Sequence, residues 1–107
     1  MNYSIHWSDR AVDSLAAIKE YISQWSPSKA EKVVSELVIY ARTLLEFPFI
    51  GVKDERFGND NMRKLIKNEH FLVYEVDGFR IEIIDAFSGK QDFQARFIEH
   101  MRERWPT

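Results

Sequence analysis

Apolar and polar residues first alternate along the chain and then recur at the spacing of a helix. Residues 2–7 place every second side chain on one face and predict a half-buried strand. Ser8 is a candidate N-cap, and residues 9–24 are predicted to form a helix behind it. The apolar positions of this first helix are Ala11, Leu15, Ile18, Ile22 and Trp25.

A short break separates the first helix from a second one. In Ser26-Pro27 the serine can cap a new helix, and proline suits the first helical turn because its missing N–H would be unbonded there anyway. Apolar residues recur at helical spacing as far as Leu45, and Pro48 and Gly51 are predicted to end the helix. So short a connection predicts an antiparallel helical hairpin.

Three further strands are predicted after a loop over residues 49–61. The strands are expected at Met62–Lys67, His70–Val76 and Phe79–Phe87. Asn68-Glu69 forms the first turn, and Asp77-Gly78 is expected to form the second with positive φ at both positions. The last strand is apolar on both faces, as a central strand of a sheet would be.

A final helix is expected beyond Ser88-Gly89, with Asp92 as its cap. Its apolar stripe consists of Phe93, Phe97, Ile98, Met101 and Trp105. The predicted fold class is therefore α+β: an N-terminal strand, an antiparallel helical hairpin, a three-stranded antiparallel meander and a C-terminal helix. A length of 107 residues fits a single domain over residues 1–107.

Composition narrows the chemistry that this domain can perform. The absence of cysteine excludes disulfides, a cysteine-bound zinc ion and a thiol nucleophile. No group of His, Asp and Glu residues has metal-ligand spacing, and no glycine-rich loop could hold a phosphate. Neither a metal nor a cofactor is expected.

Charge and targeting signals bear on location and partners. The first residues show no signal-peptide pattern, and no apolar stretch reaches the roughly 20 residues of a membrane span. These observations predict a cytoplasmic protein that does not contact a membrane. The net charge of −2 argues mildly against nucleic-acid binding, which a local basic patch could override.

Local signatures follow one another in order along the chain. They are the strand-to-helix transition at residues 7–11, the Phe-Pro and Gly within Leu44–Gly51, Arg63 in the second strand, and the apolar segments Phe71–Val76 and Ile81–Ile84. The series spans nearly the whole chain and resembles the RelE/ParE toxin superfamily.

The resemblance implies the toxin of a type II toxin–antitoxin system, a growth-inhibiting protein that a cognate antitoxin neutralises in a hetero-oligomer. ParE-like members poison DNA gyrase and carry no nuclease site, whereas RelE-like members cut messenger RNA on the translating ribosome. A third interpretation is a degenerate, non-toxic interaction module that retains the fold. The final helix either covers the edge of the sheet or leaves a groove for an antitoxin segment.

Five side chains are candidates for contact with the target or for catalysis. They are the cations Arg63, Lys67, Arg80 and Lys90 and the acid/base candidate His70. Metal-free RNA cleavage needs a base, an acid and cations for the developing phosphorane charge, and histidine titrates nearest neutrality. A regular strand would put Arg63 and Lys67 on one face and Lys64 on the other, so the cations cannot all converge.

The segment after the last strand bears on the choice between the two toxin activities. RelE-like nucleases have basic or proton-transferring side chains there, whereas residues 88–92 of this chain offer only Lys90 and no histidine or tyrosine. This departure and the acidic pI favour a ParE-like or otherwise non-nuclease mode, with the ribosome-dependent endoribonuclease as the main alternative. We also expect Arg63 and Lys67 to have little structural purpose, because surface ion pairs contribute only about 0–1 kcal/mol.

Overall fold

The computed structural model describes residues 2–89 of the chain. The elements are β1 (Ser4–Trp7), α1 (Asp9–Ser23), α2 (Pro27–Ala41), the 3-10 turns η1 (Arg42–Leu45) and η2 (Glu55–Phe57), β2 (Met62–Lys67), β3 (His70–Asp77) and β4 (Arg80–Ser88). They follow the predicted order. The expected final helix and Lys90 lie outside the described residues. Within the described part, neither helix has the length and apolar character needed to cross a membrane.

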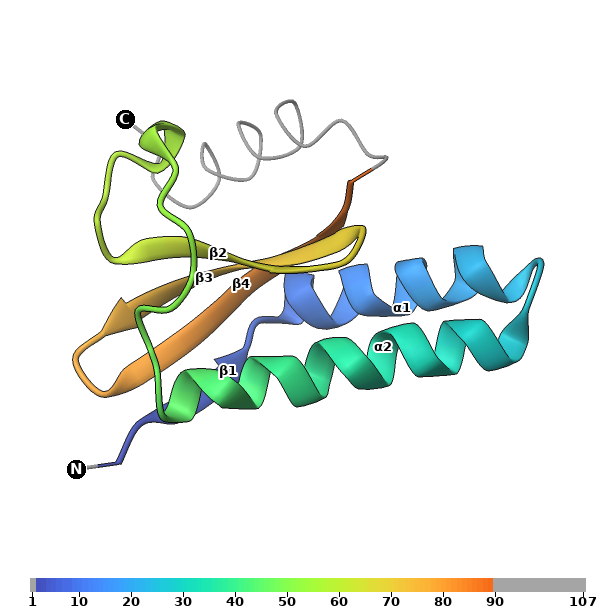
Figure 1. Cartoon of the computed structure of the whole chain (residues 1–107), viewed down its shortest axis with the longest axis horizontal. Coiled ribbons are helices and arrows are strands. Elements are labelled where there is room, and N and C mark those ends of the chain that lie inside the picture. The colour runs from blue at the N-terminus through green and yellow to red at the C-terminus, as the bar shows by residue number, and fades with distance from the viewer. Residues whose placement is uncertain (1, 90–107) are drawn as a thin grey trace.

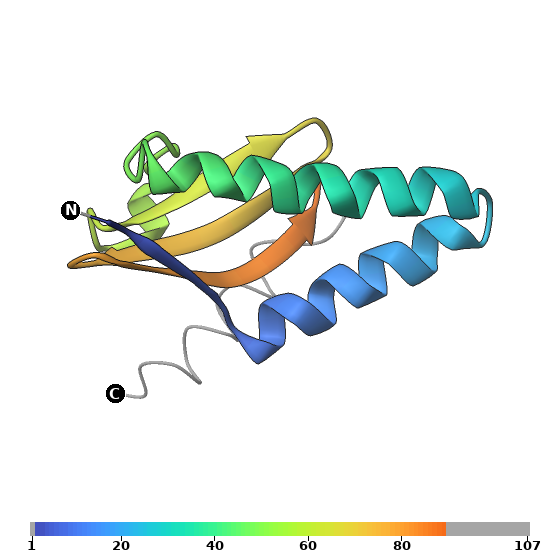
Figure 2. The same ribbon diagram turned by 90° about the horizontal axis from the view of Figure 1, so that it is seen from below.

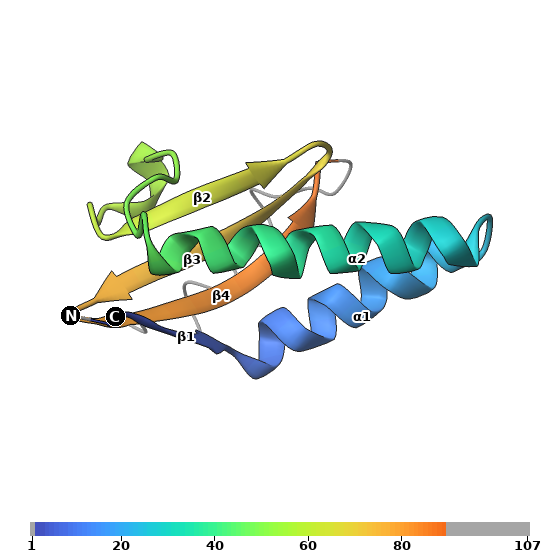
Figure 3. The same ribbon diagram turned by 60° about the horizontal axis from the view of Figure 1, so that its bottom comes forward.

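The strands form one sheet in the order β1-β4-β3-β2. β4 pairs in parallel with β1 and antiparallel with β3, which pairs antiparallel with β2. Figure 1 shows α1 and α2 side by side along one face of the sheet, and Figure 2 views them from that side. Figure 3 shows the tip of the helical hairpin extending past the end of the sheet. The predicted α+β fold with a meander and a helical hairpin is confirmed.

The core is divided between the two faces of the sheet because side chains alternate along each strand. On the helix side, Leu72 and Ile81 are fully buried with Leu37 of α2. On the other side, a smaller cluster is formed by Phe57, Met62, Val73, Ile84 and Phe87. β4 contributes to both clusters, as its apolar sequence predicts.

The start of α1 is tied to β4 by two side chains. Ser8 caps the helix by accepting a hydrogen bond from the Ala11 N–H at 3.0 Å, and its hydroxyl donates to the Ile84 carbonyl oxygen at 2.7 Å. One turn later, Ser14 Oγ donates to Oδ1 of the buried Asp85 at 2.5 Å. The register between β3 and β4 shifts at this point, which is typical of a β-bulge. The helix is therefore anchored where the central strand is irregular.

Two details of the helical hairpin differ from the prediction. α2 ends at Ala41 and continues as a 3-10 turn only to Leu45, short of Pro48. The Thr43 hydroxyl donates to the Tyr40 carbonyl oxygen at 2.7 Å, a local bond that competes with the helical pattern. Trp25, predicted to share the apolar stripe of α1, is 67% exposed because it follows the end of that helix.

The turn between β3 and β4 is also displaced from its predicted position. Asp77 pairs with Arg80, so the turn consists of Gly78 and Phe79. Gly78 has a φ of 60°, and Asp77 does not share a positive φ. Glycine at the first central position is the pattern of a type II′ turn, which spares Asp77 a conformation that side chains disfavour. The other predicted turn, at Asn68-Glu69, lies where it was expected, and Asn68 has a φ of 57°.

The buried helix-side cluster gives a direct test of the packing. Leu72→Ala removes a side chain with no exposed surface and should lower the free energy of unfolding by about 2–5 kcal/mol through the cavity it leaves. Ile39→Ala, at a position 62% exposed on α2, should change it by less than about 0.5 kcal/mol. Urea unfolding of the purified chain measures both, and equal effects would contradict this packing.

Candidate functional site

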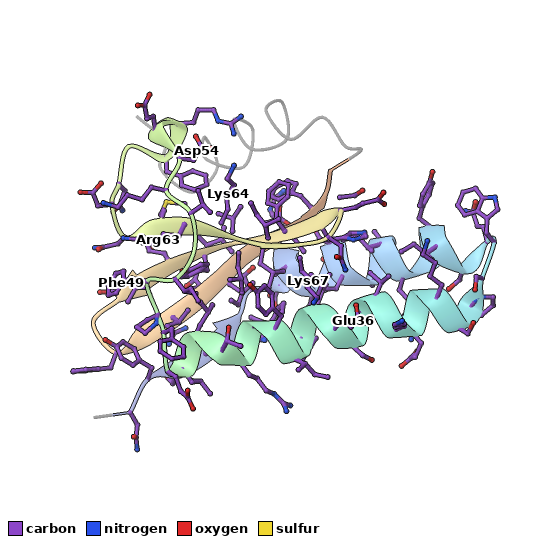
Figure 4. The ribbon with its side chains drawn as sticks, in the orientation of Figure 1. Glu36, Phe49, Asp54, Arg63, Lys64 and Lys67 are labelled. Carbon is purple, nitrogen blue, oxygen red and sulfur yellow. The ribbon has the colours of Figure 1, made fainter. Side chains whose placement is uncertain are left out.

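Edge strand β2 carries two of the candidate cations on the helix side of the sheet. Arg63 and Lys67 flank the buried Leu65, and Lys64 points to the opposite face. Figure 4 shows Lys64 beside Asp54 on the side away from the helices and Lys67 on the side of α2. The predicted division of these cations between the two faces is confirmed.

Arg63 holds the loop that follows α2. Its Nη1 donates hydrogen bonds to the carbonyl oxygens of Phe49 and Gly51, each at 3.1 Å. The guanidinium carbon lies 5.1 Å from the centroid of the Phe49 ring, a cation–π contact. The expectation that Arg63 has little structural purpose is therefore wrong, because its side chain binds two carbonyls of a segment distant in sequence.

A buried tyrosine holds the same loop from the neighbouring strand. The hydroxyl of Tyr74, on β3, accepts a hydrogen bond from the Gly51 N–H at 2.9 Å, and burial raises the pKa of this hydroxyl. A Cβ at Gly51 would lie 2.6 Å from that oxygen, so only glycine allows this approach. Val52 and Lys64 then exchange two backbone hydrogen bonds of 2.8 and 2.9 Å. Hydrogen bonds therefore hold the loop backbone at two consecutive residues, Gly51 and Val52.

This fixed loop, residues 47–52, is called the apolar loop below. Its large apolar side chains point largely to solvent: Phe47 is 57% exposed, Phe49 46%, Ile50 54% and Val52 53%. The sequence pattern predicted a loop over residues 49–61 but did not predict this exposed apolar surface. The available signal is four large apolar residues within six positions, in a segment with neither helical nor strand periodicity.

Lys67 and His70 are brought together by the β2–β3 turn. They pair across the two strands, and Lys67 Nζ lies 5.5 Å from the centroid of the Tyr40 ring. Both line a shallow cavity of about 300 Å³ between α2 and the turn. The pKa of His70 is lowered, mainly by burial; Glu69 raises it and Lys29 lowers it further.

Arg80 does not join this group. It opens β4 opposite Asp77, whereas His70 pairs with Ser88 at the other end of the same strand. Ile81 faces the helices, so strand alternation turns Arg80 toward the opposite face from Arg63. Lys90 lies outside the described residues. The structure thus places Lys67 beside His70, Arg63 further along the same face of β2, and Arg80 apart from all three.

A charged cluster on the other face was not foreseen. Asp54 caps η2, accepts a hydrogen bond from Arg56 Nε at 2.9 Å, and lies 3.1 Å from Lys64 Nζ. Hydrogen bonds from the Arg56 side chain and backbone, followed by Lys64, hold the pKa of Asp54 well below its usual range against the effect of burial. Lys64 Nζ also lies 5.8 Å from the centroid of the Phe71 ring. These contacts hold η2 over the smaller hydrophobic cluster on the face of the sheet opposite the helices.

A larger cavity of about 650 Å³ lies between the distal half of the helical hairpin and the end of the sheet. Its wall includes Ile22 and Trp25 from the α1 side and His70 and Ser88 from the end of the sheet. Trp25 packs edge-on against the Tyr21 ring, with a centroid distance of 4.8 Å. Across residues 2–89, no three His, Asp or Glu side chains are grouped so as to hold a metal ion.

The two cations of β2 should behave differently on substitution. Arg63→Ala removes two hydrogen bonds to the apolar loop and should lower the free energy of unfolding by about 1–3 kcal/mol. Lys67→Ala should cost less than about 1 kcal/mol, because it removes only an aromatic contact. Arg63→Lys should fall between them, since an ammonium does not reproduce the planar guanidinium. Urea unfolding distinguishes these values, and equal costs for both alanines would show that the loop does not depend on Arg63.

The Asp54 cluster predicts an acid-dependent loss of stability. Because the folded-state pKa of Asp54 is depressed, its contribution is complete above the unfolded-state pKa of about 4 and is lost as pH falls below that value. Asp54→Asn should therefore lower the melting temperature at pH 6 and flatten its dependence on pH below about 4. Asp13→Asn, on the exposed side of α1, is the control. Parallel melting curves for wild type and Asp54→Asn from pH 6 to pH 2 would contradict this account.

Comparison with known proteins identifies the family. Residues 5–93 match the model of the ParE toxin of the type II toxin–antitoxin system parDE. The toxin RelE2 of Caulobacter vibrioides is 32% identical over 74 residues, which cover 67% of this chain and 80% of that toxin. A structure of the chromosomal ParDE toxin–antitoxin system from P. aeruginosa superposes with a TM-score of 0.68 at 24% identity, covering 80% of this chain and 95% of that one. The last match shows a shared fold.

The extent of these matches settles the family. The ParE model spans most of the chain, from β1 to beyond β4, and the match to RelE2 covers four fifths of that toxin. Membership implies a cognate antitoxin as a partner. The chain belongs to the ParE toxin family of the RelE/ParE superfamily and is the toxin of a type II toxin–antitoxin system.

Proposed function

We propose that this toxin arrests growth without cutting RNA, in a ParE-like mode directed at DNA gyrase. The observation that carries the proposal is the dispersal of the candidate cations over the sheet. Arg63 is engaged with the backbone of the apolar loop, and Arg80 lies at the far end of β4 on the other face. A phosphorane would need several positive charges around a single point.

The proton-transfer requirement supports the same mode. His70 is the acid/base candidate, and burial lowers its pKa, which disfavours the protonated form that would donate to a leaving oxygen. Glu69, beside it, adds a negative charge that would repel a phosphate. These features support a mode that does not depend on RNA cleavage. Either target would place the toxin in the cytoplasm.

An RNA-cleaving mode is the second candidate function. Lys67 and His70 face each other across the β2–β3 turn at the edge of a cavity, so one cation and one imidazole do converge. An imidazole in its neutral form could act as a base toward a 2′-hydroxyl. The relative in C. vibrioides carries the RelE name, whereas the matching family model carries the ParE name.

The two modes separate in a paired assay. Expression of the chain alone should arrest bacterial growth, and coexpression of its antitoxin should restore it. Purified toxin should stabilise gyrase–DNA cleavage complexes in a supercoiling assay and leave messenger RNA on translating ribosomes uncut by primer extension. Primer-extension stops in the ribosomal A site, lost in His70→Gln and retained in the matched variant Arg80→Gln, would instead establish the nuclease.

A further inference from the structure

Within residues 2–89, two cations on the edge strand form no ion pair with a carboxylate. Several other basic side chains of the described region are paired with carboxylates: Lys19 with Glu31, Lys32 with Glu36, Lys53 with Asp60, and Arg56 and Lys64 with Asp54. No described carboxylate forms an ion pair with Arg63 or Lys67. The two positive charges on the helix side of β2 are therefore uncompensated within residues 2–89.

Both cations are held in place by aromatic rings and not by acidic groups. Arg63 rests against Phe49, and Lys67 lies over Tyr40. Four residues along a strand separate their backbones by roughly 13 Å. Nη1 of Arg63 serves the two loop carbonyls, and Nη2 remains able to donate to a carboxylate. The side chains are oriented before any partner arrives, which lowers the entropy cost of binding.

The apolar loop lies directly beside the first of these cations. Arg63 and Tyr74 fix its backbone, so Phe47, Ile50 and Val52 are presented to solvent on a rigid segment. The solvent-exposed apolar surface of these side chains contributes no hydrophobic stabilisation to the domain itself. Concentrated exposed apolar surface of this kind marks an interaction site.

We infer that the apolar loop and the helix-side edge of β2 form a docking surface for the cognate antitoxin. The segment that binds carries an apolar side chain against Ile50 and Val52 and carboxylates placed to reach Arg63 and Lys67. This inference rests on membership of the toxin family and not on the proposed gyrase target. Glu36 and Glu69 line the cavity beyond Lys67, so the preference for acidic groups is strongest at the Arg63 end.

The observations favour a protein segment over nucleic acid as the occupant. Phosphate recognition depends on many cations, and this chain has a net charge of −2 with two unpaired cations on the surface in question. The loop has two aromatic side chains, Phe47 and Phe49, but its aliphatic Ile50 and Val52 offer no ring face on which a base could stack. Apolar surface of this kind also suits a long-lived complex, which neutralisation of a toxin requires.

The test measures antitoxin binding by variants of the full-length toxin, refolded from its complex with the antitoxin encoded beside it. Ile50→Ser and Lys67→Ala should each weaken the complex by about tenfold or more in calorimetric titration. The Lys67→Ala complex should also lose part of its salt dependence. Two substitutions on α2 are the controls and should stay within about twofold of wild type: Ile39→Ser, at a position exposed to a similar extent as Ile50, and Lys32→Ala, at a position more exposed than Lys67. Circular dichroism and melting curves verify that every variant is folded.

Growth assays separate this surface from the target site. In cells that produce the antitoxin, Ile50→Ser should arrest growth where the wild-type toxin is silent. Folded Ile50→Ser and Lys67→Ala variants that bind the antitoxin as tightly as wild type would overturn the inference. So would an Ile50→Ser variant that no longer arrests growth but still binds the antitoxin, because the surface would then belong to the target. Tight binding of a single-stranded RNA oligonucleotide that competes with the antitoxin at this surface would overturn the choice of a protein occupant.

Discussion

The central strand β4 has apolar side chains on both of its faces, and the rest of the structure follows from covering them. The helical hairpin covers one face, where Ile81 and Ile83 are buried, and η2 supplies Phe57 to the other. Ser8 and Ser14 then fix α1 to β4 beside the register shift, so the hairpin has one position on the sheet. The tip of the helical hairpin extends past the end of the sheet (Figure 3). Residues near this tip and residues at the end of the sheet line the larger cavity.

Covering the second face requires the chain to cross the edge of the sheet between α2 and β2. The crossing segment is the apolar loop, and its polar backbone must find partners at an edge where β2 is the last strand. Arg63 and Tyr74 supply those partners from two adjacent strands, and Val52 pairs with Lys64. Asp54 continues the attachment on the far face by binding Lys64. β2, together with Tyr74 of β3, therefore holds the segment between α2 and β2 on both faces of the sheet.

Local sequence patterns predicted most of the fold but not the contacts of the candidate site. Alternation and helical spacing identified the strands and helices of the described region, and the face of Arg63 and Lys67 followed from strand geometry alone. The partners of Arg63 could not be found this way, because carbonyls carry no sequence signature and lie 14 and 12 residues away. Local periodicity also failed at Trp25, just beyond the helix, where no rule fixes the direction of the side chain. Contacts of these kinds depend on which distant segments of the chain the fold brings together.

The distribution of charge explains how an acidic protein can present a positive surface. Ion pairs within the chain neutralise basic side chains such as Lys19 and Lys64, and their partners are exposed or belong to loops. Arg63 is different because two carbonyl oxygens accept hydrogen bonds from its Nη1 without cancelling its charge, while its buried Nε has no hydrogen-bond partner among the described residues. The Arg63 guanidinium thus has two effects. It holds the backbone of the apolar loop, and its positive charge lies beside the exposed apolar side chains of that loop. For this reason Arg63 cannot be assigned to a nuclease site merely because it is a cation on the expected strand. Its hydrogen bonds hold the apolar loop, and its positive charge is available to a partner that binds beside this loop.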